Sequence, residues 1–357
     1  MSKLSIGIVG LPNVGKSTLF NALLGRQIAD ASNYPFCTID PNIGVVEVPD
    51  QKLKILADIV KTDKIVPAIV EFVDIAGLVK GASQGEGLGN KFLTNIRDCQ
   101  AICHVVRNFS DSNIIREGSS DPQGDFEVVC AELIIKDLET IDKFLDQNKN
   151  NALEKNSKKF ILAQKIKSEM EKGLLAVNLK LDDEDRNLLN DFFLLTAKPY
   201  FIVANVDESA YQNIENYNLK IEDFSVVPVS AKIEFELSEL APEDRQNYLQ
   251  QLGVKKSGLE RVISKAYETL GLQSYYTAGI KEAKAWTIKQ SATAPQAAGV
   301  IHTDFERGFI MAEIISYDNF IKYNGWQPAK EAGKLRHEGK DYIMQPDDVV
   351  EFRFNVT

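Results

Sequence analysis

The chain has 357 residues, which corresponds to roughly two or three domains of ordinary size. Hydrophobic residues make up 44% and charged residues 26%, the usage of a folded globular protein, so collagenous and wholly disordered chains are excluded. Because 51 acidic side chains outnumber 41 basic ones, the net charge is −10, and the chain lacks the basic surplus of a protein that coats DNA or an anionic membrane.

Cysteine usage and the first residues indicate the compartment. Cys37, Cys99, Cys103 and Cys130 form no C-x-x-C pair, which speaks against a zinc cage and against a secreted disulfide framework. The N-terminus has no signal-peptide pattern, and no uncharged apolar stretch reaches about 18 residues. We therefore expect a cytoplasmic protein with neither DNA nor a membrane as a partner.

In chain order, the first predicted elements are a buried strand, a glycine-containing loop and a helix that begins near Ser17. Further continuous apolar runs rich in β-branched residues are typical of strands buried on both faces of a parallel sheet. The predicted strands cover residues 4–9, 69–73, 101–106, 200–204 and 226–229. This alternation predicts an α/β fold with a doubly wound, mainly parallel sheet.

Between residues 127 and 196 the spacing becomes helical. Apolar residues recur every three or four positions in two runs separated by a polar turn, which predicts an antiparallel helical hairpin whose apolar stripe is its own seam. The seam residues are Ile134, Leu138, Ile141 and Leu145, then Phe160, Ala163, Ile166, Met170 and Leu174. After a helical stretch at 257–270, residues 276–357 mix short strands with Gly, Pro and Asn turns, which predicts a separate α+β unit.

The segment Gly10–Ser17 satisfies the pattern G-x-x-x-x-G-K-[ST] and lies between a predicted strand and a predicted helix. In such a phosphate-binding loop the glycines let backbone N–H groups surround a phosphate, and the helix N-terminus adds a favourable dipole. Lys16 would reach the β- and γ-phosphate oxygens, and the Ser17 hydroxyl would bind Mg²⁺.

Two further segments complete the predicted phosphate and magnesium site. Asp74 follows an apolar strand and begins a D-x-x-G pattern, so its carboxylate can hold a magnesium-bound water while the Gly77 N–H meets the γ-phosphate. Thr38 is the candidate switch threonine that joins the Mg²⁺ ligands when a γ-phosphate is present. Leu78 stands where small GTPases carry the glutamine that orients the attacking water, so we expect slow intrinsic hydrolysis.

The segment Asn205-Val206-Asp207-Glu208 predicts the base that is bound. GTP-binding switch proteins read guanine with N-K-x-D, but here Val206 lacks the lysine stem and Glu208 carries its carboxylate one methylene further out. Without a carboxylate in the position that accepts from guanine, the site loses much of its preference for guanine. Adenine then becomes acceptable, and Asn205 can reach its N7 or 6-amino edge. The loop that closes over the base is expected at Ser230, Ala231 and Lys232.

Taken together, these motifs resemble the Obg-like ATPases, the YchF family of P-loop proteins associated with translation, over essentially the whole chain. The resemblance is carried by Gly10–Ser17, by Phe36–Pro41 (F-C-T-I-D-P), by Asp74–Ala82 and by the N-x-x-E form of Asn205–Glu208. It implies a GTPase-type domain over residues 1–128 and 197–272, a helical coiled-coil insertion over 129–196, and a C-terminal TGS domain of ubiquitin-like β-grasp fold over 274–357.

The resemblance also implies an ATPase that prefers ATP to GTP and uses Mg²⁺, with K⁺ stimulation through Asn13 as a further expectation. The implied nucleotide-binding residues are Asn13, Val14, Gly15, Lys16, Ser17, Thr18, Asn205, Val206, Glu208, Ser230, Ala231 and Lys232. The implied catalytic residues are Lys16, Thr38 and Gly77, and the implied metal ligands are Ser17, Thr38 and, through water, Asp74. The family's loop histidine is missing from 113–118, where Arg116 is a speculative substitute.

Relatives of this family bind the ribosome, particularly the large subunit, so a ribosomal partner and an RNA contact through the TGS domain are implied. In this chain Lys330, Lys334, Arg336 and Lys340 cluster near Trp326 and Tyr342, which places cations beside aromatic rings. Residues 274–357 nevertheless carry ten Lys and Arg against eleven Asp and Glu. A solvated surface of mixed charge is therefore at least as good an interpretation as an RNA-binding patch.

Two other functions stay open from the residues. One is a GTPase of the Obg type in which Glu208 still reads guanine from a shifted base position. The other is a nucleotide-gated binding module with negligible turnover, which Leu78 and the missing loop histidine favour.

Overall fold

The computed structural model describes residues 4–25, 42–75, 95–110, 121–151, 157–222 and 224–355. These residues form two compact units, which we treat separately. The first unit draws on residues 1–27, 38–44 and 71–266, and the second includes residues 45–70 and 267–357. No helix within the described ranges is both long and apolar enough to cross a membrane.

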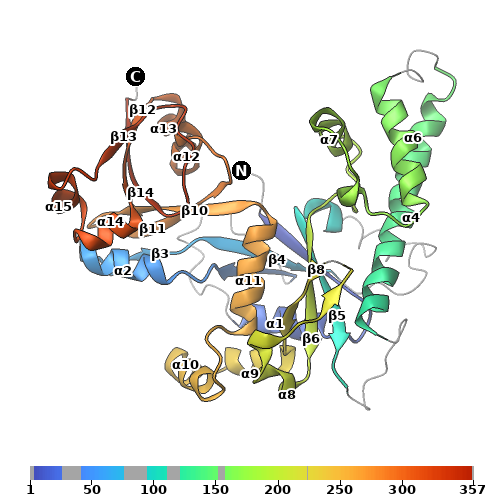
Figure 1. Ribbon diagram of the computed structural model, residues 1–357, viewed down its shortest axis with the longest axis horizontal. Helices are drawn as coiled ribbons and strands as arrows, with labels where there is room; N and C mark the ends of the chain where they lie inside the picture. The colour runs from blue at the N-terminus through green and yellow to red at the C-terminus, as the bar shows by residue number, and fades with distance from the viewer. Residues whose placement is uncertain are drawn as a thin grey trace. The chain divides into compact units, whose positions relative to one another are not determined.

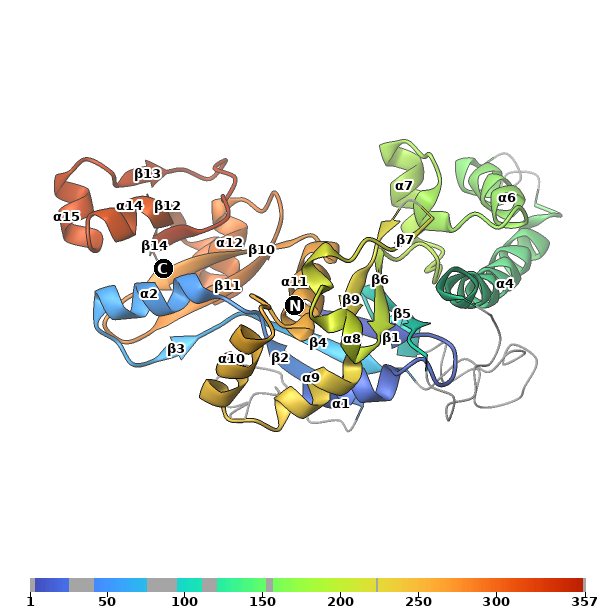
Figure 2. The same ribbon diagram turned by 60° about the horizontal axis from the view of Figure 1, so that its bottom comes forward.

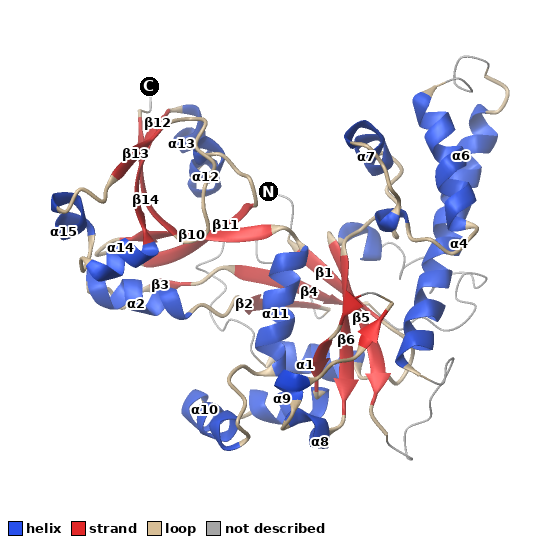
Figure 3. Cartoon of the chain, in the orientation of Figure 1, coloured by secondary structure: helices blue, strands red, loops and turns tan. Residues whose placement is uncertain are grey.

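A six-stranded sheet carries the nucleotide-site motifs (Figures 1 and 3). Its strand order is β2 (Ile43–Glu47), β4 (Ile69–Asp74), β1 (Ser5–Val9), β5 (Ala101–Asn108), β6 (Tyr200–Val206) and β9 (Val227–Val229). The pairs β1–β4, β1–β5, β5–β6 and β6–β9 are parallel. All five residues of β1 and the first seven of β5 are buried, because helices cover both faces of a parallel sheet.

Several helices pack on this sheet or against one another. α1 (Lys16–Leu24) begins directly after the phosphate loop and packs against α9 (Ala231–Ser238), while α4 (Pro122–Asn148) packs against β5. The same unit also contains the short hairpin β7 (Lys220–Ile221) and β8 (Phe224–Ser225), together with the helices α8 (Glu208–Tyr211), α10 (Pro242–Gln251) and most of α11 (Gly258–Thr269).

The inserted helices form the expected antiparallel pair. α4 and α6 (Lys158–Met170) run side by side (Figure 2), and each begins at a residue whose side chain accepts from the first turn: Asp121 from Gly124 N and Ser157 from Phe160 N. The predicted seam residues are buried or half-buried up to Met170, but Leu174 is 40% exposed. Its placement in the seam was wrong because α6 ends at Met170 and Gly173 adopts φ 90°.

A buried carboxylate fixes the insertion to the segment that leads back to the sheet. Asp137, on α4, is 1% exposed, and it accepts from Leu195 N at 2.8 Å, from Thr196 N at 2.7 Å and from Thr196 Oγ1 at 2.7 Å. Every one of these donors lies close to 60 residues further along the chain. A third helix of the insertion, α7 (Asp183–Asn190), precedes them.

The second unit is built on another six-stranded sheet. Its order is β13 (Arg336–Glu338), β12 (Phe309–Ser316), β14 (Asp348–Phe354), β10 (Leu272–Ala278), β11 (Ala283–Lys289) and β3 (Ile65–Val66). β10 and β11 form an antiparallel hairpin, and β14 lies parallel to β10 and antiparallel to β12. The helices are α12 (Ala294–Ile301), α13 (Thr303–Arg307), α14 (Tyr317–Lys322) and α15 (Trp326–Glu331). The predicted fold class, a P-loop α/β sheet with a helical insertion and a C-terminal α+β unit, is confirmed.

Residues 45–70, which the predicted domain organisation places with the nucleotide-binding domain, include elements that pack in the second unit. α2 (Gln51–Val60) buries Leu53, Leu56 and Ala57 and packs against β10 and β11, and β3 pairs with β11. The Tyr276 hydroxyl donates to Asp50 Oδ2 at 2.8 Å. α2 and β3 therefore belong to the C-terminal unit, whereas β2 and β4, at the two ends of this segment, lie in the first sheet. The domain boundaries stay a prediction.

The stability of the first unit is expected to depend on pH through His104, which lies on β5. His104 is 2% exposed between the rings of Phe126 and Tyr200, its Nδ1 has no hydrogen-bond partner among the described residues, and burial lowers its pKa to about 3. Below the ordinary pKa near 6.5 the unfolded chain binds a proton that the folded chain does not. We therefore expect the free energy of unfolding to fall by about 1.4 kcal/mol per pH unit between about pH 6.5 and 3.

Urea unfolding at pH 7.5 and pH 5 measures this effect. The His104→Phe variant should lose most of the difference between the two pH values, since it removes the buried imidazole. The His337→Gln variant, which removes an exposed imidazole, should keep the difference. An unchanged difference in His104→Phe would contradict the assignment.

Candidate nucleotide-binding site

The predicted phosphate loop lies between β1 and α1, as its sequence requires. Lys16 opens α1 and is 7% exposed, with Nζ donating to the carbonyl oxygen of Leu11 in the same loop at 2.7 Å. Burial lowers the pKa of Lys16 to about 8, against an opposing effect of Asp74. Within the described residues its hydrogen bond goes to an uncharged carbonyl, so a desolvated cation here gains a stronger partner in an anionic phosphate. Ser17 and Thr18 are exposed in the first turn of the same helix.

Ser17 and Asp74 lie next to each other, although they are 57 residues apart in the chain. Ser17 Oγ lies 3.5 Å from Asp74 Oδ2, and Asp74 Oδ1 is buried without a hydrogen-bond partner among the described residues. Burial raises the pKa of Asp74, while Lys16 and Ser17 act in the opposite direction. A hydroxyl beside a carboxylate oxygen that needs a donor fits Mg²⁺ with its bound water, because Mg²⁺ prefers oxygen ligands and keeps several waters.

Asn205 joins the phosphate loop to the loop after β9. Its side chain is buried, with Nδ2 donating to the carbonyl oxygen of Val14 at 3.0 Å and Oδ1 accepting from the N–H of Ala231 at 3.0 Å. The structure therefore brings three predicted binding segments together through one amide. Its role in holding the site together follows from these contacts, whereas the predicted contact with adenine stays a prediction.

Gly15 is required at this junction for two reasons. Its φ is 99°, which L side chains rarely adopt, and a Cβ there would lie 2.1 Å from Asn205 Nδ2. We expect Gly15→Ala to weaken nucleotide affinity at least tenfold, since the Asn205 side chain would have to leave the phosphate loop. The matched control is Gly173→Ala, because Gly173 has φ 90° with nothing within 4 Å of the new Cβ. Calorimetric titration should show a loss only for Gly15→Ala; equal affinities in both variants would contradict the prediction.

The remaining residues of the predicted base segment each contact another part of the protein. Val206 is 3% exposed and packs in the apolar core, so its side chain does not replace the missing lysine stem. Asp207 accepts from Ser110 N, with its two oxygens at 3.2 and 3.3 Å. Glu208 forms an ion pair with Lys232. Of the closing loop, Ser230 and Ala231 are buried and Lys232 is exposed.

Several predicted site residues are not among those that the structure describes. Thr38, Gly77 and Leu78 lie outside the described residues, as do Cys37 and the loop at 113–118. Asn13, the expected K⁺ ligand, is exposed in the phosphate loop with φ 62°. The other three cysteines are buried free thiols, and burial raises the pKa of Cys99 to about 11.

Sequence reasoning missed the contacts that hold the base side of the site in place. Glu234, on α9, is fully buried and accepts from the Tyr211 hydroxyl at 2.6 Å and from Gly258 N at 2.5 Å, so one carboxylate ties α9 to α8 and α11. An acidic residue in a helix ordinarily faces solvent, so the sequence held no signal for this role.

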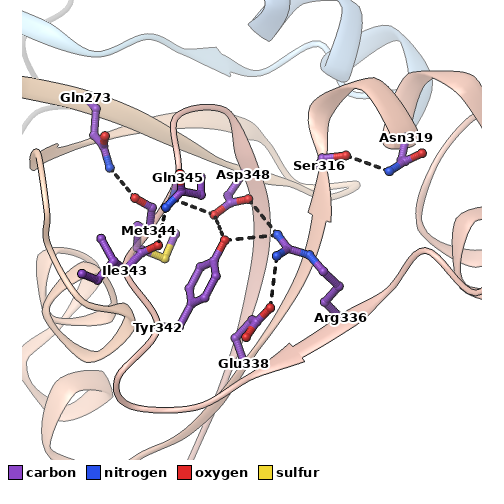
Figure 4. A network of polar contacts seen from close by, with 10 residues as sticks. All are labelled: Gln273, Ser316, Asn319, Arg336, Glu338, Tyr342, Ile343, Met344, Gln345 and Asp348. Atoms are coloured by element: carbon purple, nitrogen blue, oxygen red, sulfur yellow. Dashed lines mark hydrogen bonds and ion pairs between the residues drawn. The ribbon is translucent and has the colours of Figure 1, made fainter.

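Three residues of the suggested RNA surface, Arg336, Tyr342 and Trp326, have hydrogen-bond partners within the C-terminal unit. Figure 4 shows the first two. Arg336 donates to Tyr342 Oη at 3.1 Å, to Asp348 Oδ1 at 3.3 Å and to Glu338 Oε1 at 3.1 Å. Asp348 is 2% exposed and also accepts from the Tyr342 hydroxyl at 2.9 Å. Trp326 Nε1 donates to Ala278 O at 2.8 Å. The cation beside an aromatic ring is therefore part of a structural network that fixes β13 and β14.

The parallel sheet, the strand–phosphate loop–helix unit and the carboxylate at the end of β4 define a P-loop nucleotide-binding domain of the GTPase type. Residues 5–165 match the family model of the 50S ribosome-binding GTPases, and residues 272–355 match the YchF-GTPase C-terminal model, described as a protein of unknown function. The chain belongs to the YchF family.

Curated relatives and a solved structure support this assignment over the full length. The Ribosome-binding ATPase YchF of Bacillus subtilis (strain 168) is 48% identical over 99% of this chain and 100% of its own length. The protein of that name from Escherichia coli O157:H7 is 50% identical over 98% and 99%. The structure of the Schizosaccharomyces pombe YchF GTPase superposes with a TM-score of 0.86 at 35% identity, covering 99% of this chain and 98% of that one.

Proposed function

We propose that this protein binds and hydrolyses ATP in preference to GTP, with Mg²⁺, and that it associates with the ribosome through its large subunit. The observation that carries the base preference is that both carboxylates after β6 already bind protein groups, Asp207 the N–H of Ser110 and Glu208 the ammonium of Lys232. Guanine needs a free carboxylate for its N1–H and 2-amino group. The names of the relatives at 48–50% identity support both ATP and the ribosome as partners.

The described residues suggest how the site would act on a triphosphate. Lys16 exchanges the Leu11 carbonyl for phosphate oxygens, and the N-terminus of α1 faces the same group. Mg²⁺, held by Ser17 and Thr38 and through water by Asp74, would neutralise charge on the phosphates. Gly77 would donate its N–H to the γ-phosphate. We expect slow intrinsic turnover and K⁺ stimulation, because Leu78 cannot orient water and Asn13 is exposed in the phosphate loop.

Paired calorimetric titrations test the base preference. ATP and GTP are titrated into nucleotide-free protein with Mg²⁺ and K⁺, and the tighter ligand is then tested for hydrolysis with and without ribosomes. Tighter binding of ATP, with hydrolysis that ribosomes accelerate, supports the proposal. Binding without hydrolysis under all conditions would instead favour a nucleotide-gated binding module.

GTP hydrolysis is the second candidate. The family model that matches residues 5–165 is described as a GTPase, and the solved relative from Schizosaccharomyces pombe carries the same description. Tighter binding of GTP in the titrations would establish this function, and Glu208 would then leave Lys232 to accept from guanine. The phosphate chemistry at Lys16 would be unchanged.

The C-terminal unit is proposed as the TGS domain that reports the nucleotide state to a ribosomal partner. For an RNA contact this unit offers Lys330, Lys334 and Lys340, which are exposed and lie outside the Arg336 network. Nuclease footprinting of ribosomal RNA with the intact protein would test this contact.

A further inference from the structure

The ion pair between Lys232 and Glu208 joins two loops of the predicted base site. Glu208 is the first residue of α8, directly after β6, and Lys232 lies in the first turn of α9, directly after β9. Their side chains are 53% and 68% exposed, so the pair faces solvent rather than the core. Because β6 and β9 are parallel neighbours, both residues lie at the same edge of the sheet as the phosphate loop.

The pair matters because the two purines present different groups to a carboxylate. Guanine offers two donors, N1–H and the 2-amino group, and an ionised carboxylate accepts both. Adenine offers at the same edge an unprotonated N1 and no 2-amino group, so a free carboxylate there would repel it. A lysine ammonium paired with this carboxylate competes with guanine for the carboxylate oxygens. It also cancels the negative charge that disfavours adenine.

The other carboxylate and the amide oxygen at this edge are already bound to backbone N–H groups. Asp207 accepts from the backbone N–H of Ser110 with both oxygens, at 3.2 and 3.3 Å. The Asn205 carbonyl oxygen accepts from Ala231 N at 3.0 Å. Glu208 is therefore the carboxylate of this segment that a guanine could recruit by displacing a side-chain partner, and Lys232 is that partner.

We propose that Lys232 is a specificity-determining residue, a positioning residue that acts through Glu208 to disfavour guanine relative to adenine. This inference rests on the proposed function, since it concerns the base bound at the same site. An exposed ion pair contributes up to about 1 kcal/mol, which corresponds to a change of about fivefold in relative affinity.

Affinities for the β,γ-imido analogues of ATP and GTP, measured with Mg²⁺, test the proposal without interference from turnover. We expect the affinity for the GTP analogue, divided by that for the ATP analogue, to rise about fivefold in Lys232→Met. Lys232→Arg restores the ion pair and should restore the wild-type ratio. The matched control is Lys149→Met, which breaks the exposed Lys149–Asp146 pair on the inserted hairpin and should leave the ratio unchanged.

A second variant shows whether the effect passes through Glu208. In the double variant Lys232→Met with Glu208→Gln, the gain for the GTP analogue should disappear, because a neutral amide with one acceptor oxygen does not replace a carboxylate. An unchanged ratio in Lys232→Met overturns the proposal, and so does a gain that persists without the Glu208 carboxylate. If the wild-type protein itself prefers the GTP analogue, the proposed ATP preference fails, while the change from wild type to Lys232→Met still decides the role of Lys232.

Discussion

Replacement of Lys16 by methionine is expected to reduce the rate of nucleotide hydrolysis by about 10²–10³-fold, the effect of removing one pre-organised electrostatic partner of the transition state. The free protein should be at least as stable as the wild type, because burial lowers the pKa of Lys16 to about 8. A lysine with a lowered pKa is less stable charged in the folded state than in the unfolded state, so removing its charge removes an unfavourable contribution at pH 7. Single-turnover hydrolysis and urea unfolding measure the two effects.

Lys198 offers the matched control. It also donates to backbone carbonyls, with Nζ 3.0 Å from Arg97 O, and burial lowers its pKa, but it precedes β6 at the opposite end of the strands from the phosphate loop. Lys198→Met should therefore change stability without changing hydrolysis. Wild-type hydrolysis in Lys16→Met would remove Lys16 from the mechanism.

The largest expected effect on stability is that of Asp137→Ala. The substitution leaves the buried N–H groups of Leu195 and Thr196 and the Thr196 hydroxyl without their acceptor. Unpaired buried donors cost about 1–3 kcal/mol each, and we expect a total loss of about 3–5 kcal/mol from the free energy of unfolding. Urea unfolding followed by far-ultraviolet circular dichroism measures it.

Asp142→Ala, on the same helix, is the control for this prediction. Asp142 is about half exposed and pairs with Lys167 at 2.6 Å, so its removal should cost no more than about 1 kcal/mol. Asp137→Asn keeps one acceptor oxygen and should fall between the two alanine variants. Equal losses in Asp137→Ala and Asp142→Ala would show that the buried carboxylate does not anchor the insertion.

Features with a local signature were predictable from the sequence. The phosphate loop is a contiguous pattern whose strand and helix follow from hydrophobic spacing, and the structure places Lys16 and Ser17 as that pattern requires. Asp74 could be placed at a strand end from the apolar run before it, and the structure shows it beside Ser17, because parallel strands bring their carboxyl ends to one edge. The hairpin seam followed from its spacing until α6 ended, where Leu174 left the pattern.

Features that depend on tertiary pairing were not predictable. Asp137 and Glu234 are acidic residues in helices, a type that ordinarily faces solvent, and only the packed structure shows which N–H groups they accept from. Arg336 near Tyr342 suggested an RNA surface, because a sequence shows that charges are near aromatic residues but not which carboxylates they pair with. A two-residue strand such as β3 has no periodicity to detect.

The path of the chain through residues 45–70 bears on how this protein could have been assembled during evolution. α2 and β3 complete the C-terminal sheet, yet they lie in the sequence between the predicted switch threonine and Asp74. Fusion of a gene segment to one end of the gene would therefore not have added the C-terminal unit in complete form. A chain ending near residue 271 would expose the buried face of α2 and leave β3 unpaired, so the two units are expected to have been inherited together rather than exchanged as modules.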